Sequence, residues 1–263
     1  MSFFVYDTVL AGGLFFGMLL MLEVGRRYGV ARVTRDPEGC DSGSGTVDAA
    51  VLSLLGLLLA FTFSGAAARF EQRRHLITQE TNTIGTAYLR LDLLPTDTQQ
   101  EIRQLFARYL ATRTSVYRNI EDAAVTQARI AETAALQRQI WAKAVSASQR
   151  SDAAADAAKL LLPALNEMID ITTTRAAAMQ NHPPRTVFFL LASLCLFSAL
   201  LVGYHMGRAK FQSWFHKILF SATLSVAFFV ILDLEYPRYG LIRIDEADEL
   251  LAELRSLMQE VNE

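Results

Sequence analysis

Two long runs without a charged side chain constrain this chain more than any other feature of its sequence. Residues 49–68 and 186–207 contain no Asp, Glu, Lys or Arg and are mostly apolar. A helix rises about 1.5 Å per residue, so about 20 residues cross the roughly 30 Å hydrocarbon core of a bilayer. Both runs are therefore predicted to span a membrane as helices.

Two shorter runs, 8–22 and 218–232, are predicted to span the membrane as well. The first reaches spanning length if residues 3–6 extend it and its acidic flanks, Asp7 and Glu23, lie at the interface. The second has charged and aromatic flanks that reach the headgroup region. The alternative is that the short runs are helices buried in a protein core. No Lys or Arg precedes the first run, and no small-x-small cleavage site follows it, so we expect a retained helix and not a signal peptide.

Composition supports the membrane class and excludes others. Of 263 residues, 52% are apolar and 20% charged, and the mean hydropathy is +0.23. The net charge of −2 gives no basic field for nucleic acid, so no nucleic-acid partner is expected. The apolar runs predict that the lipid bilayer surrounds the spans. Cys195 lies in a predicted span and Cys40 in a polar loop, which predicts no disulfide.

Between the second and third spans, residues 69–185 are predicted to form a soluble helical bundle. Apolar residues recur there at helical spacing and no strand pattern is present. Residues 94–97 and 146–152 break the pattern, which favours three or four antiparallel helices. The apolar stripes indicate an ordinary core, and a ligand groove is the alternative.

The predicted fold is an all-α membrane protein with four transmembrane helices and a C-terminal amphipathic helix. Its parts are a first transmembrane hairpin (1–68), the soluble helical domain (69–185), a second hairpin (186–235) and a C-terminal segment and helix (236–263). Asp245 is expected to cap the last helix, whose apolar stripe docks either on the middle bundle or on a neighbouring subunit.

The charge distribution gives a prediction of orientation. Loops 23–47 and 208–217 are short and basic, and no Lys or Arg precedes the first span. By the positive-inside rule these two loops are expected in the cytoplasm, which puts both termini and the middle domain outside.

The sequence carries no catalytic or metal-binding motif. None of its four histidines has a Cys, His or carboxylate partner at a metal-binding spacing, and nucleophile-elbow, phosphate-loop and dinucleotide motifs are absent. We therefore expect no enzyme activity, no cofactor and no bound metal.

The second span has small residues at helical spacing along one side, at positions 49, 53, 56, 60, 64 and 67. Small residues allow close helix approach in a bilayer, which is the structural interpretation. The functional interpretation is that this span lines a conduction path, with hydroxyls along it and aromatic rings that narrow it. The pore-lining candidates are Ser53, Gly56, Phe61, Thr62, Phe63 and Ser64.

Polar residues follow the second span and end the fourth, and they are candidates for an ion vestibule or a subunit contact. They are Arg73, Glu80, Asn82, Thr86, Arg90, Asp233, Glu235 and Arg238. We expect Asp233 to pair with Arg238 or a neighbouring helix, because an unpaired charge near lipid is costly. Glu235 is then expected to face water at the mouth of the path, where carboxylates attract cations. The alternative is a solvated, salt-bridged helix.

Residues 54–95 and 232–245 resemble the bacterial bestrophin-like family of membrane proteins. The strings are LLGLLLAFTFSGAAARFEQRRHLITQETNTIGTAYLRLDLLP and LDLEYPRYGLIRID. Bestrophins are ion channels whose pore runs along the second membrane helix and whose helical domain is cytoplasmic. The resemblance therefore implies a channel, with an orientation opposite to the one that the charge count favours.

The sequence thus supports two hypotheses. The first is a homo-oligomeric multi-pass protein of the bacterial inner membrane that conducts a small ion along its second span. The second is a membrane-anchored sensing or interaction module whose helical domain binds a ligand or partner. A solvated path along an oligomer axis distinguishes them.

Overall fold

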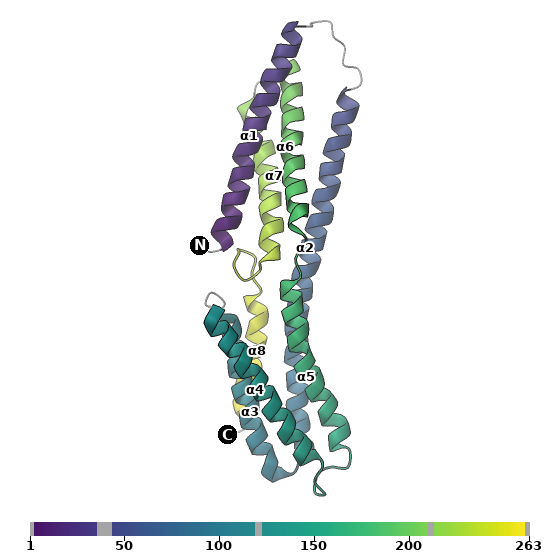
Figure 1. The fold of residues 1–263 in the computed structure, drawn as a ribbon, viewed down its shortest axis with the longest axis vertical. Helices are drawn as coiled ribbons and strands as arrows, with labels where there is room; N and C mark the ends of the chain where they lie inside the picture. The colour runs from purple at the N-terminus through teal and green to yellow at the C-terminus, as the bar shows by residue number, and fades with distance from the viewer. Residues whose placement is uncertain (1–2, 36–43, 119–122, 210–212, 261–263) are drawn as a thin grey trace. The chain divides into compact units, whose positions relative to one another are not determined.

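A computed structural model describes residues 3–35, 44–118, 123–209 and 213–260, and these residues are mainly helical, with no strand among them. The helices are α1 (Phe3–Arg35), α2 (Ser44–Leu89), η1 (Arg90–Leu93), α3 (Thr96–Arg118), α4 (Ala123–Ser148), α5 (Ala157–Gln180), α6 (Arg185–Arg208), α7 (Trp214–Glu235) and α8 (Asp245–Glu260). Figure 1 shows their course. The predicted loop position of Cys40 lies outside the described residues.

Four helical segments among the described residues are long and apolar enough to cross a membrane. They are Val5–Arg35, Gly45–Leu93, Ala157–Arg208 and Trp214–Glu235, and they contain the four predicted runs. The two short runs qualify because α1 and α7 continue beyond them. The predicted all-α membrane fold, with a helical bundle between spans two and three and a C-terminal helix, is confirmed.

The chain divides into two compact units, and each has its own core. The first comprises residues 1–70 and 182–243, and the second comprises residues 71–181 and 244–263. Helix α2 contributes its residues up to Phe70 to the first unit and the rest to the second.

In the first unit, α6 and α7 both pack against α1 (Figure 1). The core contains Leu14, Met18 and Leu22 of α1 together with Leu191 of α6 and Phe228 of α7. The spacing of the α1 residues, four apart, places them on one side of that helix.

A glycine seam between α1 and α6 is formed by Gly25, Gly29, Gly203 and Gly207. A Cβ on Gly25 would collide with the carbonyl oxygen of Leu200, and one on Gly203 with that of Leu22. Because later residues of α1 meet later residues of α6, the two helices run in the same direction. Each helix carries a G-x-x-x-G motif, which brings helix backbones into contact in membranes.

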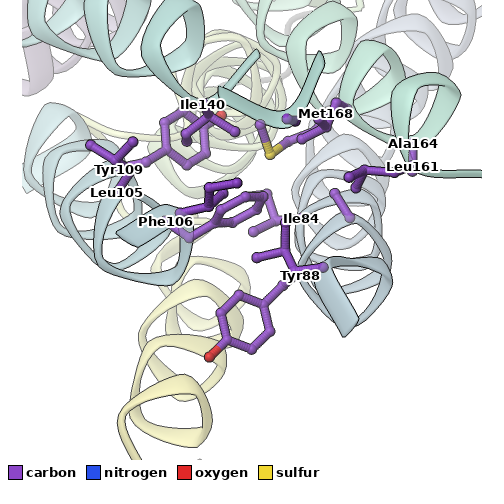
Figure 2. Packing of buried hydrophobic residues seen from close by; sticks show 14 of the residues in the cluster. Ile84, Tyr88, Leu105, Phe106, Tyr109, Ile140, Leu161, Ala164 and Met168 are labelled. Carbon is purple, nitrogen blue, oxygen red and sulfur yellow. The ribbon is translucent and has the colours of Figure 1, made fainter. Parts of the chain in front are cut away.

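The second unit is a bundle built from α3, α4, α5, α8 and the last turns of α2. Figure 2 shows Ile84 and Tyr88 of α2, Phe106 and Tyr109 of α3, Ile140 of α4 and Met168 of α5 in one buried cluster. The rings of Tyr88 and Phe106 meet edge to face at 5.7 Å.

The apolar stripes predicted for this domain are buried in its own core. Leu251 and Met258 of α8 are buried in the same cluster, so the C-terminal helix docks on the bundle. This decides between the two docking sites that the sequence left open.

Candidate functional site

The membrane part of α2 exposes the side that carries the small residues. Ala49, Ser53, Gly56, Ala60 and Ser64 are all exposed, and we call this the open face of α2. A Cβ added to Gly56 would meet no atom within 4 Å. In the single chain, therefore, the small residues of α2 do not pack against the other spans. The close helix approach in this unit is made by the glycine seam between α1 and α6.

The six pore-lining candidates divide between different sides of α2. Ser53, Gly56 and Ser64 belong to the open face, and the rings of Phe61 and Phe63 are 65% and 47% exposed beside it. At about 100° per residue, Thr62 lies half a turn away from Ser53. Its hydroxyl donates to the carbonyl oxygen of Leu58 at 2.7 Å. The six residues therefore do not line a single face.

Thr62 instead borders a groove inside the first unit. The groove has a volume of about 210 Å³ and is lined by Phe61, Thr62, Gly65, Arg69, Pro183, Val187, Phe188, Ile231 and Glu235. Its walls come from α2, the start of α6 and the end of α7. The lining of the groove is mostly apolar and also contains the charged pair Arg69 and Glu235.

The expectation that Glu235 faces water is wrong. Its side chain is 1% exposed and is ion-paired with Arg69 of α2. Arg69 Nε donates to Oε1 at 2.9 Å, and His182 Nδ1 lies 3.4 Å from Oε2. The ring of His182 also stacks on Tyr236 at 4.8 Å. A guanidinium at this distance compensates a carboxylate that water does not reach, which is why Glu235 turns inward.

Asp233 is buried, as expected of a paired carboxylate, and backbone amides are its partners. Its two oxygens accept hydrogen bonds from the N–H groups of Leu241 and Ile242, at 2.9 and 2.7 Å. A Cβ on Gly240 would collide with this carboxylate, so glycine is required in the turn after α7. Arg238 is 8% exposed and buried in the same unit.

Two of the vestibule candidates, Arg73 and Glu80, are buried in the second unit. Arg73 donates to the carbonyl oxygens of Ala178 and Asn181 at the C-terminal end of α5, where the helix dipole favours a cation. Glu80 is fully buried. It is bonded to Arg113, whose Nε lies 2.7 Å from Oε1, and to Arg175, which also pairs with Asp248 of α8 at 3.6 Å. We call Glu80, Arg113, Arg175 and Asp248 the Glu80 network.

The charge state of Glu80 follows from this environment. Burial raises its pKa, but Arg113 and Arg175 outweigh burial and hold the pKa below the ordinary value for glutamate. Glu80 is therefore an ionised member of the bundle interior and does not line a vestibule in this unit.

The remaining polar candidates are Asn82 and Thr86 of α2 and Arg90 of η1. Asn82 and Thr86 are exposed, while Arg90 donates from Nη1 to the carbonyl oxygen of Leu160 at 2.6 Å. Within the described residues, no group of three or more His, Cys, Asp or Glu side chains could hold a metal ion.

Sequence reasoning missed Arg69, His182 and the glycine seam. Arg69 directly follows the uncharged run 49–68, and nothing in the local sequence points to a partner 166 residues away. The seam had a readable signal, the paired G-x-x-x-G motifs. The first of them lies beyond Glu23, outside the uncharged run that defined the first span.

Comparison with known proteins identifies the family. The family model described as the bestrophin-like domain matches residues 4–248, which confirms the resemblance. Two crystal structures of variants of a bacterial bestrophin homologue from Klebsiella pneumoniae are similar, with TM-scores of 0.68 and 0.65 and 14% identity. They cover 94% and 93% of this chain, and 99% of their own in each case. A crystal structure of a membrane-protein variant has a TM-score of 0.68 at 14% identity and covers 95% of this chain and 98% of its own. No curated protein sequence matches the chain.

Proposed function

Because this chain belongs to the bestrophin-like family, we propose that it is a homo-oligomeric channel for a small ion in the bacterial inner membrane. In this proposal the open face of α2 lies along the conduction path. Lipid surrounds the other spans, and neither a cofactor nor a metal takes part.

The observation that carries the proposal is the weak coverage of α2 by its own chain. In its most apolar window 11% of the residues are buried, against 44% for α7. A span that its own chain leaves uncovered contacts lipid, a neighbouring subunit or a water-filled path. Small residues suit lipid contact poorly, because they offer little apolar surface and leave the backbone accessible.

The chemistry of the open face suits passage better than tight binding. The hydroxyl of Ser53 donates to the carbonyl oxygen of Ala49 at 2.7 Å, which satisfies it within the helix. Gly56 leaves the backbone approachable, and the rings of Phe61 and Phe63 flank the face where apolar side chains narrow a path. Since Glu235 is buried and paired, it gives no reason to expect cation preference.

The sensing alternative rests on the size of the helical domain between two spans. The apolar stripes of the helical domain pack against one another in its own core (Figure 2). The channel proposal therefore accounts for more of the molecule.

We expect the purified protein to pass small ions when reconstituted in liposomes, and Gly56→Leu to reduce the flux at least tenfold. Tenfold corresponds to a barrier higher by about 1.4 kcal/mol. The leucine fits the single chain, because no atom lies within 4 Å of the new Cβ. Its effect therefore arises from what faces α2 in the assembly.

Gly13→Leu is the matched control, because a Cβ at Gly13 of α1 also meets no atom within 4 Å. Native mass spectrometry of both variants separates the two interpretations of the small residues. Lost flux with an intact oligomer supports a pore face, whereas loss of the oligomer supports a helix interface. Unchanged flux and assembly in Gly56→Leu would contradict the proposal, and so would equal losses in the control.

The orientation is tested separately, because charge distribution and family resemblance predict opposite results. We expect a cysteine at exposed Ile130, in a chain without Cys40 and Cys195, to react in intact cells with a membrane-impermeant thiol reagent if the charge count is right. Labelling only after lysis would establish the bestrophin orientation, with the helical domain in the cytoplasm.

A further inference from the structure

The uncharged run of α2 begins and ends at a charged residue that is bonded to another helix. Asp48 precedes residues 49–68 and Arg69 follows them. Asp48 is bonded to His205 of α6, and Arg69 to Glu235 of α7. We call these contacts the first anchor and the second anchor of α2.

The second anchor holds the end of the run through a buried carboxylate. Glu235 is 1% exposed, and Arg69 reaches it with two donors, Nε and Nη2. Gly65 makes room for this guanidinium, since a Cβ there would lie 3.3 Å from its Nη1. His182, stacked on Tyr236, approaches the same carboxylate from the segment before α6.

The first anchor ties the start of the run to the rigid part of the unit. The Asp48 side chain is 13% exposed and is bonded to His205 Nε2. The ring of His205 meets that of Tyr204 edge to face at 5.6 Å. The backbone of Tyr204 faces Gly25 and Gly29, so His205 directly follows a residue of α6 that contacts the glycine seam.

Between the anchors, few residues of α2 are fully buried, while Leu58, Leu59 and Ala67 pack partly buried against the core of the first unit. Within residues 49–68, all of them described, Leu55 and Ala66 are the buried residues. In a bilayer, apolar burial does not drive helices together, because lipid tails are equally apolar. Polar contacts act more strongly there than in water, since the surroundings screen them less.

We propose that the two anchors set the tilt and rotation of α2 and so determine which residues its open face presents. Asp48, Arg69, His182, His205 and Glu235 are therefore positioning residues for the pore helix. The effect of the anchors on ion passage rests on the proposed function. The geometric part concerns α2 within the first unit and stands independently.

The test measures the position of α2 directly. Spin labels are attached at Leu57 of α2 and Phe197 of α6, both exposed, in a chain without its two cysteines. The labelled chain is diluted with unlabelled chain in lipid nanodiscs, and the distance distribution is measured by double electron–electron resonance. We expect Arg69→Gln and Asp48→Asn each to broaden or shift the distribution.

Charge reversal provides the rescue that a general loss of folding would not show. Arg69→Glu alone should shift the distribution, and combining it with Glu235→Arg should restore it. Arg129→Gln is the matched control, because Arg129 forms an exposed pair with Glu132 on α4. An unchanged distribution in both anchor variants would overturn the inference, as would a double variant that fails to restore the position.

Ion flux measured on the same samples separates this inference from the proposed function. We expect the anchor variants to change flux at least fivefold and the charge-reversed pair to recover it. If no sample conducts while the distances respond as expected, the anchors stand and the channel proposal fails. If wild-type protein conducts while the distances do not respond, the channel stands and the anchors fail.

Discussion

Gly203→Ala and Gly203→Leu are expected to prevent α1 and α6 from packing and to remove most of the folded protein. The Cβ that either substitution adds would collide with the backbone carbonyl of Leu22, which cannot turn aside as a flexible side chain can. Overpacking of a well-packed core costs about 1–3 kcal/mol, and a clash with backbone belongs at or above the upper end of that range. The measurement is the yield of monodisperse protein and its thermal unfolding temperature in mild detergent.

Gly56→Leu is the control for this prediction, because it adds a larger side chain to another span without a clash inside the chain. When both proteins are measured as single chains, we expect the unfolding temperature of Gly56→Leu to stay near that of the wild type. A Gly203→Ala variant as stable as the wild type would show that α1 and α6 do not approach as closely as the seam requires.

Glu80→Gln is expected to destabilise the helical domain by about 3–5 kcal/mol, because it removes the buried charge that Arg113 and Arg175 share. The side chains of Arg113 and Arg175 are only 6% and 4% exposed. The network joins α2, α3, α5 and α8, so the loss should affect the whole second unit. Thermal unfolding of the full chain, followed by circular dichroism, measures it.

Glu71→Gln is the matched control, because Glu71 lies on the same helix but forms an exposed pair with Arg74. Exposed pairs contribute about 0–1 kcal/mol, so the control should unfold close to the wild type. Equal effects of the two substitutions would mean that the Glu80 network does not stabilise the bundle.

The stability of the protein should depend on pH through the same Glu80 network. Since the pKa of Glu80 is lower in the folded state than its ordinary value, its stabilisation is present above about pH 4.3 and is lost as the pH falls through the folded value. Wild-type protein should therefore lose more stability on acidification below that pH than Glu80→Gln does. Parallel pH profiles of the two proteins would contradict this expectation.

Much of the fold was predictable because it depends on local sequence patterns. The lengths of the uncharged runs predicted the four spans, since spanning a bilayer is a requirement of length and polarity alone. Apolar spacing predicted the bundle, because residues such as Phe106 and Met168 fall on the inner sides of their helices wherever those helices dock.

The candidate site was predictable only in part. Periodicity identified the small residues of α2 as one side of a helix, and the structure shows that side uncovered in the chain. The same reasoning placed Thr62 with Ser53 in one candidate set, although half a helical turn separates them. It also placed Glu235 in water, because the local sequence offers only Arg238 as a partner.

The sequence by itself determined that this chain is helical, spans a membrane and carries an uncharged second span with small residues along one side. Only the tertiary structure decided which charges meet. Glu235 is buried because Arg69 lies beside it, and Glu80 is ionised in the interior because Arg113 and Arg175 converge on it. The physical reason is that helix formation and membrane spanning depend on neighbours within a few turns. A buried ion pair depends on where helices that are distant in the sequence pack against each other, and no local pattern encodes that.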